Sequence, residues 1–163
     1  MAEEYKKRFG DDWGYFHNPI IISDWVKYQK NYISIKKYPL KIGYFGRIGR
    51  ANKQSIQLFI DAVSSGKIDT PVELHLFTNF TSHNYNLENI IFHPFLDNSL
   101  MPVTITSFDF LLLPISFNDE DVSFAKYSMP TKLSEYLISG VPVIVLAPNT
   151  IAISNFFSKN NCG

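Results

Sequence analysis

The sequence is almost without cysteine, since Cys162 is the only one among 163 residues. One cysteine cannot form a disulfide within the chain or supply a zinc ribbon, and this usage fits a reducing compartment, so we expect a cytoplasmic location. A dominant charge is also lacking, because 15 Lys and Arg balance 15 Asp and Glu. No global field attracts nucleic acid, and we expect no nucleic-acid partner.

Long apolar runs are missing as well. No stretch approaches the ~18 apolar residues of a membrane-spanning helix, and the charged opening MAEEYKKRFGDDWG does not resemble a signal peptide. The sequence leaves open whether the complete protein associates with a membrane. We expect neither a metal nor a cofactor, because the histidines are scattered, at His17, His75, His83 and His93. The run NDED, Asn118–Asp121, could bind a cation, but a solvated loop is the more common origin of such a run.

What is present is a hydrophobic fraction of 45 %, enough for one domain with a core. After an aromatic-rich, irregular segment, strand-like and helix-like patterns alternate, with a polar stretch over residues 116–128. Strands are expected at 40–46, 72–77, 89–93, 108–114 and 141–147, and helices near 24–30, 53–65, 97–107, 130–139 and 151–159. This alternation predicts an α/β fold with a Rossmann-like parallel sheet and helices on both faces.

The loop after the first strand is rich in glycine and in positive charge. It reads GRIGRANK and carries Arg47, Arg50 and Lys53 between a strand and a helix. Glycine permits close approach of the backbone, and these cations suit phosphate oxygens. The spacing G-x-x-G-x-x-G differs from the dinucleotide fingerprint, so nicotinamide binding is poorly supported. On the residues alone, solvated surface cations are an equally good interpretation.

A second candidate segment is SMPTKLSEYLISG. Pro130 suits the first turn of a helix, and Thr131 and Lys132 lie in the same predicted turn. Glu135 lies roughly 200° around the helix from Leu133, so we expect it to face away from the apolar stripe. Without further context, a solvated surface carboxylate is the more common role for such a residue.

The order of several motifs resembles the nucleotide-sugar-binding half of GT-B glycosyltransferases, most closely the retaining family GT4. The motifs are Gly46, Arg47 and Lys53, then Glu135, Gly140, Pro142, Val143 and Ile144, with NIIFHPF, FDFLLLP and the linker-like FHNPI. The resemblance runs from about residue 16 to the end. It divides the chain into a linker and N-terminal segment, 1–39, and a nucleotide-sugar-binding domain, 40–163, that is expected to be truncated at its C-terminus.

The resemblance also implies roles for particular residues. Arg47 and Lys53 would hold the diphosphate of a UDP- or GDP-sugar and stabilise it as the leaving group, while Glu135 would accept hydrogen bonds from the ribose. The remaining implied donor contacts are Gly46, Pro130, Thr131 and Lys132, with His93, Pro94 and Phe95 as candidates for contact with the base. No metal is implied, and the expected ligand is a nucleoside-diphosphate sugar.

Two departures from the family limit this interpretation. Tyr127 stands where many members have an earlier glutamate, and Asp119, Glu120 or Asp121 could replace it. The chain also matches only the donor half, so we expect a fragment that lacks an N-terminal acceptor-binding domain and transfers no sugar alone. Polysaccharide synthesis is the default pathway of bacterial members. A GT-B-like sugar-nucleotide epimerase domain and a non-catalytic nucleotide-binding module remain alternatives.

Overall fold

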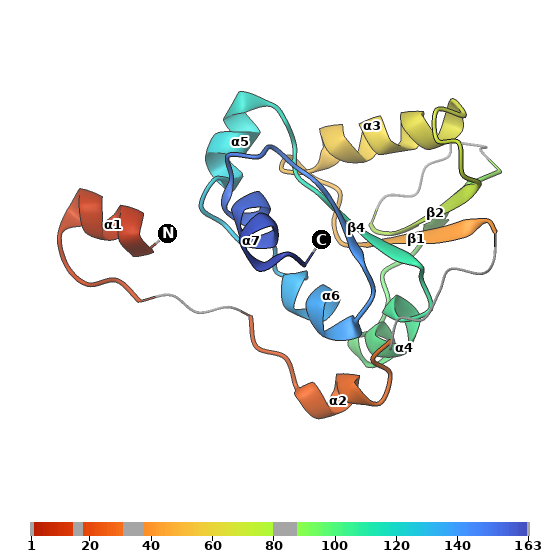
Figure 1. Ribbon diagram of the computed structural model, residues 1–163, viewed down its shortest axis with the longest axis horizontal. Coiled ribbons are helices and arrows are strands. Elements are labelled where there is room, and N and C mark those ends of the chain that lie inside the picture. Colours follow the sequence, from red (N-terminus) through yellow and green to blue (C-terminus); the bar gives the residue numbers. More distant parts are fainter. Residues whose placement is uncertain (1, 15–17, 31–37, 80–87, 163) are drawn as a thin grey trace.

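The computed structural model describes residues 2–14, 18–30, 38–79 and 88–162. Its centre is a parallel sheet with the strand order β3-β2-β1-β4-β5, flanked by helices (Figure 1). The strands are β1 (Leu40–Phe45), β2 (Val72–Phe77), β3 (Ile90–His93), β4 (Phe110–Pro114) and β5 (Val143–Leu146). The predicted α/β, Rossmann-like parallel fold is thereby confirmed.

Helices connect these strands and precede them in the sequence. They are α1 (Ala2–Phe9), α2 (Ile22–Val26), α3 (Lys53–Ser64), the short 3-10 helix η1 (Asn98–Leu100), α4 (Met101–Ile105), α5 (Asp119–Ala125), α6 (Leu133–Ser139) and α7 (Ala152–Asn160). Within the described residues, no helix is both long and apolar enough to cross a membrane.

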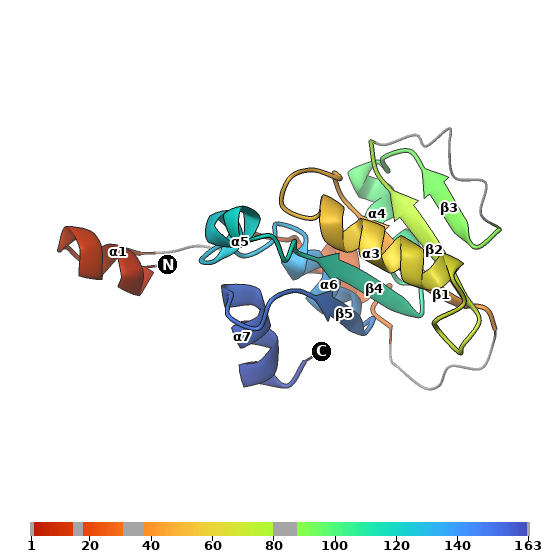
Figure 2. The same ribbon diagram turned by 90° about the horizontal axis from the view of Figure 1, so that it is seen from above.

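The alternation of side chains along β1 separates two apolar cores. Ile42 and Tyr44 point to the face covered by α3 and pack with Ile56, Ile60 and Leu112. The opposite face carries Phe45, which belongs to a core shared with α2, α4, α6 and α7 (Figure 2). The strand β4 contributes to both cores, which explains its continuous apolar sequence.

The N-terminal segment, predicted to be largely irregular, contains two helices. Residues 18–30 run along α6, and Trp25 of α2 is buried in the core on that face. The Ser134 hydroxyl donates to the carbonyl of Asn18 at 3.1 Å, and the amide of Lys30 donates to the carbonyl of Ser139 at 2.8 Å. We call residues 18–30 the N-terminal strap.

Two further local predictions need correction. The stretch 116–128 is not a simple polar loop, because it contains α5, whose first turn carries the acidic run Asp119–Asp121. Pro130 and Thr131 precede α6 instead of lying in its first turn, and Lys132 is the N-cap residue. The chain approaches this helix through a turn closed by a bond from the amide of Leu133 to the carbonyl of Pro130, at 3.0 Å.

Candidate functional site at the sheet edge

The carboxyl ends of β1 and β4 frame a cavity of about 420 Å³. These neighbouring strands mark the point where the chain reverses its direction of travel across the sheet, which is where open α/β sheets bind ligands. The cavity is bounded by the ends of the two strands, the loop after β1, α5 and the entry to α6. Its walls include Gly46, Arg47, Ala51, Asn52, Pro114, Phe124, Met129, Pro130, Thr131, Lys132 and Tyr136. Arg47, Pro114 and Thr131, from three different segments of the chain, all line this cavity.

The loop after β1 is held in shape by two buried or half-buried polar side chains. The Tyr44 hydroxyl donates to the carbonyl of Arg47 at 2.9 Å. The Asn52 amide nitrogen donates to the Tyr44 hydroxyl at 2.8 Å and to the same carbonyl at 3.1 Å, while its oxygen accepts from the amide of Gly49 at 2.9 Å. Burial raises the pKa of Tyr44, so this hydroxyl keeps its proton. The backbone around Arg47 is therefore fixed before any ligand arrives.

The three cations of this loop have different surroundings. Arg47 lines the cavity, whereas Lys53 begins α3 outside the lining residues; both are exposed, and neither forms an ion pair within the described residues. Arg50 is bound to α5, with its Nε 2.8 Å from Oδ1 of Asp121 and a terminal nitrogen 3.1 Å from Oε2 of Glu120. This bond to Arg50 lowers the pKa of Asp121. Arg47 is thus the guanidinium of this loop that is available to an anion in the cavity.

The opposite wall is tied to the same strand end by Tyr136 of α6. Its buried hydroxyl accepts a hydrogen bond of 3.0 Å from the amide of Phe45. Burial raises the pKa of this phenol too, so it remains neutral at ordinary pH. Because Lys132 and Glu135 stand on the turn that leads to Tyr136, this bond sets their position relative to the loop after β1.

Glu135 is not a fully solvated carboxylate. It faces Lys132, whose ammonium lies 3.1 Å from Oε1 and 2.9 Å from Oε2 of Glu135. The Oε2 atom is shielded from solvent and forms no hydrogen bond of good geometry within the described residues. Lys132 lines the cavity, whereas Glu135 is not among the lining residues and is connected to the site through its contact with Lys132. A shielded carboxylate oxygen with spare acceptor capacity is suited to a hydroxyl donor once the lysine moves toward an anion.

The connection between β4 and α5 is fastened to the start of α3. The Gln54 side-chain oxygen accepts from the hydroxyl of Ser116 and from the amide of Phe117, at 3.0 and 3.1 Å. The Ser55 hydroxyl donates to the carbonyl of Ile115 at 2.7 Å. Asn118 then caps α5 by accepting from the amide of Glu120. These bonds hold α5 at the carboxyl end of β4 (Figure 2).

The predicted base-contacting residues do not line this cavity. His93 ends the edge strand β3, and its ring stacks on Phe77 with 4.2 Å between ring centroids. Its Nε2 lies 2.9 Å from Nδ1 of His75. Pro94 and Phe95 follow on the exposed surface. Burial is the main cause that lowers the pKa of both histidines. A base contact at these residues stays a prediction.

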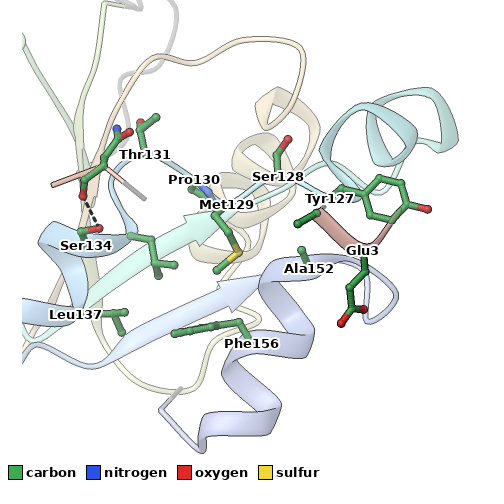
Figure 3. Close-up of a pocket in the computed structure, with 13 residues that line it drawn as sticks. Glu3, Tyr127, Ser128, Met129, Pro130, Thr131, Ser134, Leu137, Ala152 and Phe156 are labelled. Atoms are coloured by element: carbon green, nitrogen blue, oxygen red, sulfur yellow. Dashed lines mark hydrogen bonds between the residues drawn. The ribbon is translucent and has the colours of Figure 1, made fainter. Parts of the chain in front are cut away.

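A second cavity of about 580 Å³ lies beside the first. Ser128, Met129, Pro130 and Thr131 line both. The side chains of Met129, Leu137 and Phe156 face its interior between α6 and α7, with Glu3 of α1 at its edge (Figure 3). Tyr127, which occupies the position of the family's earlier glutamate, lines this neighbouring groove and not the cavity at β1 and β4.

Four residues that shape the site were not singled out from the sequence: Tyr44, Asn52, Phe124 and Tyr136. Asn52 alone left a recognisable signal, because asparagine directly before a helix is a common N-cap. Here its side chain binds backward into the loop and makes no cap bond. The two tyrosines follow ordinary apolar periodicity, which does not reveal the partner of a hydroxyl. Within the described residues, no three His, Cys, Asp or Glu side chains gather as a metal site would require.

The comparison with known proteins gives one result. The family model described as "Glucosyltransferase 3-like, C-terminal domain" matches residues 57–163, which include β2 to β5 and most of the cavity wall. Comparison with curated proteins yields no significant match. Comparison with solved structures yields none either. The match spans well over half of the chain, so the chain is a glycosyltransferase domain and belongs to the family of glucosyltransferase 3-like C-terminal domains.

Proposed function

We propose that this chain is the donor-binding domain of a retaining glycosyltransferase of the GT-B type, most like GT4. Its ligand is a nucleoside-diphosphate sugar, with uridine or guanosine as the base, and the acceptor is unspecified. The observation that carries the proposal is the cavity at the β1–β4 switch, which is lined by Arg47 of a fixed glycine-containing loop; this arginine forms no ion pair within the described residues.

The diphosphate is assigned to the loop after β1. Gly46 and Arg47 lie at the cavity, and the Arg47 backbone is held by Tyr44 and Asn52. A guanidinium presents a planar fork to phosphate oxygens, and little entropy is lost when its backbone is already ordered. Lys53 is close in sequence and free of ion pairs within the described residues, so it adds positive charge at long range.

The ribose is assigned to Glu135, the carboxylate that pairs with Lys132. In this assignment an incoming diphosphate competes for Lys132, and the released carboxylate accepts from the two vicinal hydroxyls. Positive groups on the diphosphate then stabilise the charge that develops on the leaving group as the sugar departs. Pro130 and Thr131 complete the wall beside Lys132.

The test is calorimetric titration of the chain with UDP and GDP, using two arginine variants of the same loop. Arg47→Ala is expected to weaken binding of the preferred diphosphate by roughly 1.5–3 kcal/mol, the range for a hydrogen bond to a charged group. Arg50→Ala is the matched control. Because Arg50 is committed to Asp121 and Glu120, its loss should change the affinity much less.

Binding of the free nucleoside should be weak in every variant, because it lacks the phosphates that Arg47 contacts. If wild-type protein binds neither diphosphate, the donor-binding assignment is wrong. If Arg50→Ala weakens binding as strongly as Arg47→Ala, the diphosphate contact is not specific to the arginine that lines the cavity.

A further inference from the structure

We infer that Phe124 of α5 is the platform on which the transferred sugar of the donor packs. This inference rests on the proposed function, because it assigns one part of the donor to one wall of the same cavity. The observation behind it is an apolar ring that lines a ligand-sized cavity and is nevertheless 71 % exposed.

Phe124 is exposed even though the helix that carries it is firmly anchored. Asn118 caps α5, and Arg50 binds Asp121 and Glu120 in its first turn. The residue after Phe124, Ala125, is buried. An aromatic ring held in water on a fixed helix loses little conformational freedom when a ligand covers it, and the apolar area it buries favours binding.

Two of the charged side chains of α5 and the tyrosine that follows this helix are already engaged elsewhere. Glu120 and Asp121 are paired with Arg50, and Tyr127 lines the neighbouring groove. Of the α5 residues, Phe124 and Ala125 line the cavity, and Ala125 has only a methyl group to offer. Phe124 is therefore the side chain of α5 with a large free surface toward a ligand.

The open side of the cavity fits the sugar better than the nucleoside. The carbon that is transferred must be reached by an acceptor, so the sugar has to lie where the cavity opens to solvent. The nucleoside is assigned to the wall that carries Lys132, whose ammonium contacts Glu135. A pyranose presents one face of C–H groups, and a flat aromatic ring covers such a face without competing for the sugar hydroxyls.

The experiment compares two pairs of probes, UDP with UDP-glucose and GDP with GDP-mannose, by calorimetric titration of the whole chain. Phe124→Ala should weaken binding of the preferred sugar nucleotide roughly three- to tenfold, as expected for one aromatic contact, and leave the matching diphosphate nearly unchanged. Phe124→Trp should restore the part of the affinity that depends on the sugar. Phe117→Ala is the control, since Phe117 is also exposed and aromatic but does not line the cavity.

Each outcome decides the inference. An equal loss of affinity for the sugar nucleotide and for the diphosphate would place the ring against another part of the donor and overturn the inference. Unchanged binding of all four probes would overturn it as well. If wild-type protein binds none of the probes, the donor-binding assignment itself fails, and the role inferred for Phe124 fails with it. A selective loss that is recovered by tryptophan supports it, with circular dichroism showing that all variants fold.

Discussion

At the scale of single residues, two tyrosine hydroxyls fix the geometry of the site from opposite walls. The Tyr44 hydroxyl donates a hydrogen bond to the carbonyl of Arg47, and the Tyr136 hydroxyl accepts one from the amide of Phe45. Both phenols have a pKa raised by burial, so neither hydroxyl ionises under ordinary conditions. They act as neutral hydrogen-bonding groups that position the backbone, which leaves the charged contacts to Arg47, Lys132 and Glu135.

Removing one hydroxyl should therefore weaken ligand binding while changing stability only modestly. In Tyr44→Phe the ring still fills its core position, but the Arg47 carbonyl loses a donor and Asn52 loses an acceptor. We expect the free energy of unfolding to fall by about 1 kcal/mol and the affinity for a nucleoside diphosphate to fall severalfold. Urea denaturation and calorimetric titration measure the two effects. Tyr38→Phe, on the exposed surface, is the control; an unchanged affinity in Tyr44→Phe would show that the loop does not need this bond.

Glu135 gives a prediction about the sugar of the nucleoside. Glu135→Ala should weaken binding of a ribonucleoside diphosphate by roughly 1.5–3 kcal/mol more than binding of its 2′,3′-dideoxy analogue. The carboxylate has hydroxyls to accept from only in the first ligand. Titrating wild-type protein and variant with both ligands isolates this contact as a double difference. Asp69→Ala, in the exposed turn after α3, should give no coupling. A coupling near zero for Glu135 would leave it with the single role of pairing with Lys132.

The sequence predicts which residues meet at the site better than it predicts their partners. Parallel strands bring their carboxyl ends to one edge, and this rule accounts for Arg47 and Thr131 lining the same cavity. The same rule does not reveal that Arg50 pairs with Asp121, because the two are separated by 71 positions and local patterns carry no information about distant side chains. Which arginine of the loop is free to bind an anion could therefore be determined only from the structure.

At the scale of elements, the end of α6 is shaped by the N-terminal strap. Gly140 ends this helix in the left-handed region, at φ +71°, and a methyl group there would lie 2.5 Å from the carbonyl oxygen of Lys30. The amide of Lys30 meanwhile donates to Ser139. Glycine is needed at this position for two separate reasons, the backbone angle and the close passage of the strap.

These two reasons can be separated by a pair of alanine variants. Gly66 also has a positive φ, +65°, but no atom lies within 4 Å of the position that its Cβ would take. Gly66→Ala should therefore lower the free energy of unfolding by about 1–2 kcal/mol, the cost of a left-handed residue with a side chain. Gly140→Ala carries the same cost and also displaces the strap, so its loss should be larger. Urea denaturation of both variants measures the difference, and equal losses would mean that the strap yields without cost.

Whole elements were predictable where burial imposed a pattern. The strand β4 is covered on both faces, and its unbroken apolar run made it recognisable. The helix α5 has only 7 residues and an acidic first turn, so no apolar stripe marked it. Its stability depends on the Asn118 cap and on Arg50, which is a tertiary contact. Short helices of this kind are set by their surroundings and not by their own propensity.

At the scale of the whole molecule, one sheet connects two apolar cores, and a histidine pair joins its edge strand β3 to the neighbouring strand β2. His75 of β2 and His93 of β3 lie with their rings parallel and 2.9 Å between facing nitrogens. One nitrogen must donate and the other accept, so the contact requires that at least one ring be neutral. Burial disfavours the charged form of both rings and lowers the pKa of each, although Glu73 acts in the opposite direction on His75.

This pair should make the stability of the domain depend on pH near neutrality. A histidine whose pKa is lowered by folding binds protons more readily in the unfolded chain, so its contribution is complete above the unfolded pKa of 6.5 and is lost as the pH falls below it. We expect the free energy of unfolding to decrease from pH 7.5 to pH 5, by at most about 1.4 kcal/mol per pH unit for each proton taken up.

Urea denaturation across this range measures the slope in wild-type protein and in the double variant His75→Gln/His93→Gln. His17 and His83 are present in both proteins, so the two proteins differ only at the pair. The lowered pKa of Asp121 belongs to a more acidic range, since its ordinary value is 3.8. The double variant should show a flatter profile, and identical slopes in the two proteins would show that the half-buried pair is not what couples folding to protons.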